Sequence, residues 1–193
     1  MDVFITTDGY TLPSGFIVKE ICCMFLNNEF NHYLMKPPMN RNLTDADRRT
    51  IRFATKNLNN LSYHDGWFPY ENMHEILLKF QEYHVYTYSD LTLKFIQNIL
   101  PTTVVTNVQE LGFQMPDKLL DANCFRSHNP RYCAKAKCVA IKQFIESWFL
   151  GFRYLVIWIH VWESCATFYL INHLWILFMF EQLHATFICT KIL

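Results

Sequence analysis

The sequence predicts a mixed α/β domain followed by an apolar helical region. Three strand-like runs joined by short turns open the chain, and helical and strand-like runs then alternate. The composition also changes at Ser147, after which charged residues almost disappear. We therefore expect one α/β domain over residues 1–146 and an apolar helical tail over residues 147–193.

The first three runs have the apolar content and the length of β-strands. They cover residues 1–5, 16–26 and 30–35. The segments between them contain turn signals, which are Asp8-Gly9, Pro13-Ser14-Gly15 and Asn27-Asn28. Consecutive strands joined by short turns predict an antiparallel meander.

Helical and strand-like segments follow in turn. Thr44, with an acid three residues later at Asp47, predicts the start of a helix that ends near Asn59. Further helices are expected over residues 71–83 and 90–100, and from Arg131 or Tyr132 onward. Strands are expected over residues 85–88 and 102–108. Together these elements predict a mixed sheet covered by helices.

Composition excludes some broad classes of function. The 193 residues are 51% hydrophobic and 18% charged, and 17 basic residues balance 17 acidic ones. A net charge of zero predicts no overall electrostatic attraction to nucleic acid. The seven cysteines show no secreted-type spacing, and the N-terminal residues do not resemble a signal peptide. We expect reduced cysteines and a cytoplasmic domain.

The element order and four short motifs resemble the DEDD-type 3′–5′ exonuclease branch of the ribonuclease H-like fold. The motifs are an acid in the first strand, GFIVKEIC in the second, VYTYSD before the third helix and RYCAKAK at the last helix. The chain more closely resembles a group of insect and insect-virus proteins that are similar to these exonucleases. The resemblance covers about residues 1–146 and implies a ribonuclease H-like fold. In active members it also implies hydrolysis of phosphodiesters with Mg²⁺ or Mn²⁺.

The resemblance further implies a site of four acids, and this chain keeps only some of them. Asp2 and Asp90 match two acids, and Tyr132 matches the general base. The other two acids fall on Phe4 and Lys137, and a lysine ammonium would repel Mg²⁺. If the fold is as expected, Phe4 and Lys137 should point into one pocket with Asp2 and Asp90.

We therefore expect a pseudo-enzyme, an exonuclease-like domain that binds nucleic acid or a protein partner without catalysis. The alternative is a metal-dependent exonuclease with a rearranged carboxylate site, in which another acid takes part. Candidate substitutes are Asp8, Glu20 and Glu110.

The stretch before and inside the last predicted helix has two further interpretations. Cys124, His128, Cys133 and Cys138 form the ligand set of a Cys₃His zinc site. Cys133 and Cys138 would lie about 140° apart on one helix, so they converge only if the helix begins after Cys133. Buried cysteines without metal are the alternative.

The same stretch is the most basic part of the chain. Its basic residues are Arg126, Arg131, Lys135, Lys137 and Lys142. A basic patch of this kind can bind nucleic-acid phosphates, and a solvated helix face has the same composition.

The tail contains two apolar runs, residues 154–162 and 164–180. The second has the minimum length of a membrane span, and tryptophans and tyrosines accompany it. A C-terminal membrane anchor is one interpretation, with the folded domain in the cytoplasm by the positive-inside tendency. The others are helices packed on the domain or on a partner, and a non-native extension.

Overall fold

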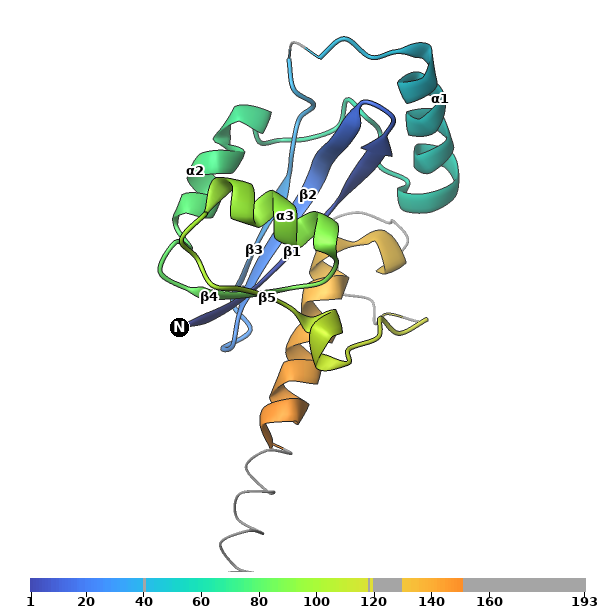
Figure 1. Ribbon diagram of the computed structural model, residues 1–193. Coiled ribbons are helices and arrows are strands. Elements are labelled where there is room, and N and C mark those ends of the chain that lie inside the picture. Colours follow the sequence, from blue (N-terminus) through green and yellow to red (C-terminus); the bar gives the residue numbers. More distant parts are fainter. Residues whose placement is uncertain (40, 118, 120–129, 151–193) are drawn as a thin grey trace, which may run out of the picture. The chain divides into compact units, whose positions relative to one another are not determined.

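The chain forms a five-stranded mixed sheet covered by helices, as seen in a computed structural model that describes residues 1–39, 41–117, 119 and 130–150 (Figure 1). The strands are β1 (Asp2–Leu12), β2 (Gly15–Phe25), β3 (Phe30–Leu34), β4 (His84–Thr87) and β5 (Val105–Asn107). Their spatial order is β3-β2-β1-β4-β5. β2 is antiparallel to β1 and β3, whereas β4 is parallel to β1 and β5. The predicted mixed α/β architecture is confirmed.

β1 is much longer than the sequence predicted, because Asp8-Gly9 is a β-bulge and not a turn. Asp8 faces Glu20 and Gly9 faces Val18, so Lys19 is the extra residue of β2. The two backbones approach closely here, since a Cβ atom on Gly9 would lie 2.0 Å from the carbonyl oxygen of Ile17. Only glycine fits this position, and the strand continues to a tight turn before Gly15.

The helices follow the predicted order with different lengths. α1 (Asp45–Ala54) begins with the predicted capping box between Thr44 and Asp47 and continues as a π-helical turn to Asn59. α2 (Met73–Leu78) follows a short 3₁₀ turn and ends earlier than predicted. α3 (Asp90–Ile99) is capped by the Ser89 hydroxyl. The last described helix comprises residues 134–150.

The two faces of the sheet bury different clusters. Val3 and Ile5 of β1 pack with residues of α2 and α3, such as Leu77 and Ile96. Phe4 points to the opposite face and packs with Ile141 and other residues of the last described helix. This alternation follows from the two-residue period of a strand. A third cluster joins the far end of the β1–β2 hairpin to α1.

The chain divides into two compact units, Met1–Ile145 and Glu146–Leu193. Nearly all of the predicted apolar tail, residues 151–193, lies outside the described residues. Within the described ranges, no helix is both long and apolar enough to cross a membrane.

Candidate functional site

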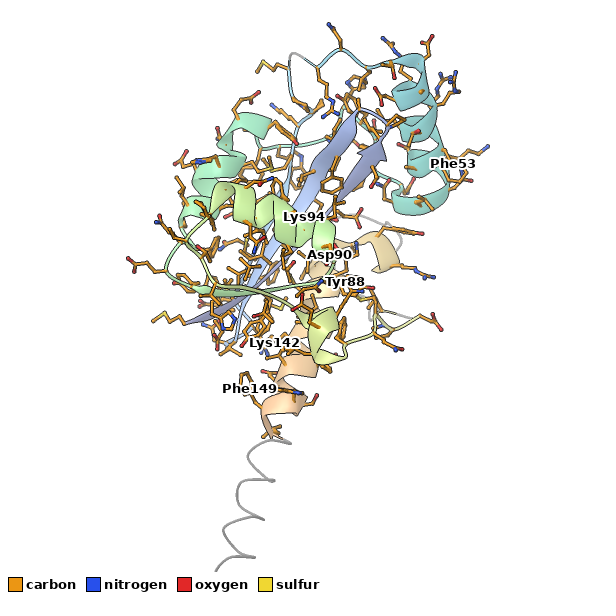
Figure 2. The ribbon with its side chains drawn as sticks, in the orientation of Figure 1. Phe53, Tyr88, Asp90, Lys94, Lys142 and Phe149 are labelled. Atoms are coloured by element: carbon orange, nitrogen blue, oxygen red, sulfur yellow. The ribbon has the colours of Figure 1, made fainter. Side chains whose placement is uncertain are left out.

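A pocket of about 430 Å³ lies at the carboxyl ends of β1 and β4, where polar side chains from four segments meet. In open α/β sheets this edge is the usual place for a ligand site. The polar residues that line the pocket include Thr7, Asp8, Ser89, Thr92, Tyr132 and Lys137. The side chains of Phe16 and Phe53 form an apolar part of the pocket wall, and Phe53, on α1, is exposed (Figure 2).

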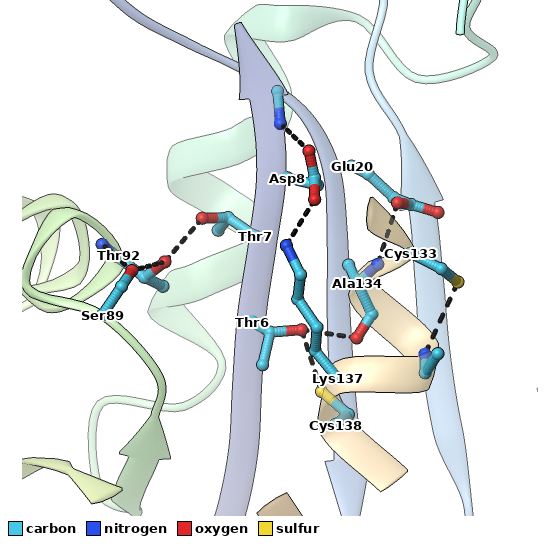
Figure 3. Close-up of polar contacts among 12 residues, drawn as sticks. Thr6, Thr7, Asp8, Glu20, Ser89, Thr92, Cys133, Ala134, Lys137 and Cys138 are labelled. Carbon is cyan, nitrogen blue, oxygen red and sulfur yellow. Dashed lines mark hydrogen bonds and ion pairs between the residues drawn. The ribbon is translucent and has the colours of Figure 1, made fainter. Parts of the chain in front are cut away.

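An ion pair between Asp8 and Lys137 is the main charged feature of this pocket. The Lys137 ammonium donates a hydrogen bond to Asp8 Oδ2, and the Gly9 N–H donates to Asp8 Oδ1 at 2.7 Å (Figure 3). The Asp8 side chain is 8% exposed and that of Lys137 is 16% exposed. Burial raises the pKa of Asp8 above its ordinary value, while the charge and hydrogen bond of Lys137 act in the opposite direction. Among the described residues, Asp8 is the only carboxylate that lines the pocket.

A row of hydroxyl groups forms the opposite wall. Thr7 Oγ1 lies 2.9 Å from Thr92 Oγ1, which lies 3.2 Å from Ser89 Oγ (Figure 3). Ser89 has a positive φ of 84°, a conformation that non-glycine residues seldom adopt. It connects the end of β4 to α3, so this backbone places its hydroxyl at the helix N-terminus. Strained backbone of this kind is concentrated at functional sites.

The predicted acids do not meet in this pocket. Asp2 lies at the opposite end of β1 beside His84, with 3.8 Å between Oδ1 and Nδ1. It is about 20 Å along the strand from Asp8, at 3.3 Å per residue. Asp90 begins α3 and accepts a hydrogen bond from Asn107 Nδ2 at 2.9 Å. The expectation of one pocket shared by Asp2, Asp90, Phe4 and Lys137 is wrong, because β1 continues to Leu12 and the acid that it places in the pocket is Asp8.

Two other side chains with predicted roles lie as follows. Phe4 is fully buried between the sheet and the last described helix, against Tyr86 and Ile141. Tyr132 does line the pocket, close in sequence to the start of that helix.

The predicted basic stretch does not form a patch in the described residues. Lys137 is paired with Asp8, and Lys142 is 6% exposed. The Lys135 ammonium lies 3.9 Å from the centre of the Phe30 ring, a cation–π contact. Arg131 is exposed, and Arg126 lies outside the described residues. The helix therefore directs some of its lysine side chains toward the sheet. The positions of the charges in the sequence do not show which side chains these are.

The predicted zinc ligands are separated where they are described. The helix begins after Cys133, as a shared ion would require. Cys138 nevertheless points into the core, where its Sγ lies 3.3 Å from the carbonyl oxygens of Phe4 and Cys22. Cys133 has different neighbours, Glu20 and His32. Cys124 and His128 lie outside the described residues.

A basic groove beside α1 is the feature that sequence reasoning missed. Arg48, Arg52 and Lys56 follow at four-residue intervals along α1 and its π-helical extension, so they form one row. Two contiguous pockets of about 570 and 460 Å³ run along this row and share Arg48, Tyr63 and His64. Lys36 and Arg41 extend the basic lining, and Glu71 is the acid among the lining residues.

The signal for the groove was present in the spacing of Arg48, Arg52 and Lys56. A four-residue repeat of one charge costs helix stability, because like charges repel at that spacing. The Arg41 guanidinium is held in place by donating to the Ser14 carbonyl oxygen at 2.8 Å and to its Oγ at 2.9 Å. The hairpin end and α1 therefore shape the groove together.

No family model matches the chain, and the searches of curated proteins and of solved structures also gave no match. The chemistry of the two sites therefore rests on their own geometry.

The polar pocket does not fit a pair of catalytic magnesium or manganese ions. Such a pair is held by several carboxylates, which neutralise four positive charges. Asp8 is the single carboxylate available among the described lining residues, and the Lys137 ammonium already neutralises it. The basic groove, in contrast, offers cationic side chains beside an aromatic ring, which suits a polyanion.

Proposed function

We propose that this chain is a ribonuclease H-like domain that binds single-stranded nucleic acid without hydrolysing it. The fold part of the proposal is supported by the strand order β3-β2-β1-β4-β5, with three antiparallel strands followed by two parallel ones. This arrangement agrees with the topology that the resemblance implies.

The observation that carries the binding function is the row of Arg48, Arg52 and Lys56 along the groove. All three side chains are exposed, and neighbours in the row are about one turn of the protein helix apart. They can therefore contact phosphates of a bound strand that have a similar spacing. Tyr63 lies half-buried in the groove wall, with His64 in edge contact at 5.3 Å between ring centres. Exposed cations beside aromatic rings bind single strands with little sequence preference.

The Asp8–Lys137 pair supports the proposal that the bound strand is not hydrolysed. Lys137 occupies the position at which the resemblance implies a metal-binding acid, and its ammonium contacts the one carboxylate of the described pocket lining. A divalent cation entering there would have to displace an ammonium from a buried partner, and Asp8 would be its single carboxylate ligand among the described residues that line the pocket.

Replacement of Arg48 and Arg52 by alanine together is expected to weaken binding of a labelled single strand. The slope of log affinity against log salt concentration should become shallower by about 1.4, because each lost phosphate contact with a single strand contributes about 0.7. Fluorescence anisotropy of the full chain at several salt concentrations measures both quantities. Lys94→Ala is the matched control, because Lys94 is an exposed cation on α3 away from the groove (Figure 2).

Equal loss of binding in Lys94→Ala would show that only overall charge matters and would contradict a groove-specific site. If the unsubstituted chain bound no single strand at low salt, the basic row would be a solvated helix face or a surface for an acidic protein partner.

For the tail we propose a membrane anchor. Trp148, Phe149 and Leu150 are 41–54% exposed, which is unusual for three successive large apolar side chains. A reporter fused to residues 147–193 should remain in carbonate-washed membranes. Leu174→Arg should release it, because a charge at the centre of a span costs about 2.5–3.5 kcal/mol, and Leu174→Ile should not. A fusion that is soluble without the arginine would contradict the anchor.

A further inference from the structure

A second cluster of reactive side chains lies on the sheet face that the last described helix covers. It consists of Glu20 from β2, His32 from β3 and Cys133, the residue just before that helix. A carboxylate oxygen, a ring nitrogen and the sulfur of these residues all lie within 4.8 Å of one another. The function proposed above uses none of these atoms.

The fold brings the three residues together through strand register and helix placement. In the β2–β3 pair, Glu20 faces Leu34 and Cys22 faces His32, so Glu20 and His32 are diagonal neighbours on one face. The first turn of the helix lies over the same place, because the Ala134 N–H donates to Glu20 Oε2 at 2.9 Å (Figure 3). The Ala136 N–H in turn donates to Cys133 Sγ at 3.5 Å.

The cluster is buried, which limits what can neutralise it. The side chains of Glu20 and His32 are 0% and 3% exposed, and Cys133 is 2% exposed. A buried carboxylate requires a proton, a cationic partner or a metal ion. In the structure His32 Nε2 lies 2.5 Å from Glu20 Oε1, so these two atoms share a hydrogen bond. A lone pair on His32 Nε2 and one on Glu20 Oε1 can instead bind one cation between them.

The donor set selects the class of that cation. One imidazole nitrogen, one carboxylate oxygen and one thiolate sulfur are ligands typical of zinc, whereas magnesium and calcium require oxygen donors. The carboxylate and the thiolate carry two negative charges, which match a divalent ion in a buried place. Three protein ligands leave a fourth tetrahedral position that water can fill.

We propose that Glu20, His32 and Cys133 form a binding site for a zinc-class transition metal ion. Binding displaces the thiol proton of Cys133, and any proton held between His32 and Glu20, to solvent. The ion would link β2, β3 and the start of the last described helix. The site shares Cys133 with the zinc set predicted from sequence and differs in every other ligand.

Titration of metal-free full-length protein with Co²⁺ tests the site, because cobalt replaces zinc and reports its own ligands. We expect a thiolate-to-cobalt charge-transfer band in the near ultraviolet, the visible bands of tetrahedral cobalt, and their loss when Zn²⁺ is added. Cys133→Ser, Glu20→Gln and His32→Asn should each remove or strongly reduce the charge-transfer band. Zn²⁺ should also raise Tm of the unsubstituted chain and leave Tm of Cys133→Ser unchanged.

Two controls separate this site from other thiols. Cys23→Ala changes a buried cysteine of the other sheet face and should leave the cobalt spectrum intact. Cys124→Ser should also retain the charge-transfer band. No thiolate band in the folded chain, or a band that survives Cys133→Ser, would overturn the proposal. A band lost in Cys124→Ser and kept in Glu20→Gln would overturn it in favour of the ligand set predicted from sequence.

Discussion

Replacement of Lys137 by methionine is expected to destabilise the domain by about 3 kcal/mol, because Asp8 would remain buried without its cationic partner. The methionine side chain has nearly the same length, so the lost charge is the main change. Equilibrium urea unfolding of the full chain measures the free energy of unfolding. Asp8→Asn should also destabilise, because it leaves the Lys137 ammonium without its carboxylate.

The double variant Asp8→Asn/Lys137→Met should lose less stability than the sum of the two single variants. Removing both charges leaves neither side chain as a buried lone ion, and such replacements are often close to neutral. Additive losses would show that the two side chains do not interact energetically, which would contradict the ion pair.

The same pair has a predictable pH dependence. The pKa of Asp8 is raised above its ordinary value of 3.8, so the native state holds its proton more tightly than the unfolded state does. Asp8 therefore contributes most to stability below pH 3.8, and this contribution is lost as the pH rises through the raised pKa. The Lys137 ammonium lowers the pKa of Asp8, so the Lys137→Met substitution should raise this pKa further. The pH range over which the Asp8 contribution to stability is lost should then extend to higher pH. A pH series of urea unfolding curves tests this direction.

Replacement of Lys19 by methionine is expected to cost about 3 kcal/mol or more of the free energy of unfolding. Lys19 is fully buried at the β-bulge, and its ammonium donates to the backbone carbonyl oxygens of Met35 at 2.6 Å and Tyr63 at 2.9 Å, and to that of Asp65. Each hydrogen bond to a charged group contributes about 1.5–3 kcal/mol, and the substitution leaves all three oxygens without this donor.

Lys19→Met should also affect the basic groove, since the Lys19 ammonium holds the segment that carries Tyr63 and His64. Amide hydrogen exchange in residues 61–66 should become faster, and single-strand binding should weaken. Lys79→Met is the control, because Lys79 is exposed on the surface at the end of α2. A stable variant with unchanged exchange would contradict the role assigned to Lys19.

Local signals in the sequence were sufficient for some elements and misleading for others. The capping box of Thr44 and Asp47 needs only residues three apart, so the start of α1 could be predicted. Asp8-Gly9 has the composition of a hairpin turn, and only its pairing with Glu20 and Val18 makes it a bulge. That long-range pairing cannot be read from the dipeptide, so the sequence alone predicts a β1 that is too short and that offers Asp2 as its acid.

The candidate sites show the same limit. Lys137 and Lys142 look like part of an exposed basic face, until the sheet against which their helix packs is known. The groove combines α1 with side chains as distant in sequence as Lys36 and His64, and the cluster of Glu20, His32 and Cys133 spans more than half of the chain. Each set depends on tertiary contacts between segments that have no shared local pattern.

One measurement tests the central claim most directly, which is binding of nucleic acid without hydrolysis. The full chain is incubated with a labelled single strand in Mg²⁺ and in Mn²⁺, and bound fraction and strand length are followed in the same samples. The expected result is a complex that weakens in Arg48→Ala/Arg52→Ala and releases an intact strand. Shortening of the strand that disappears in Asp8→Asn would contradict the account, because it would mean that Asp8 holds a catalytic metal ion despite Lys137.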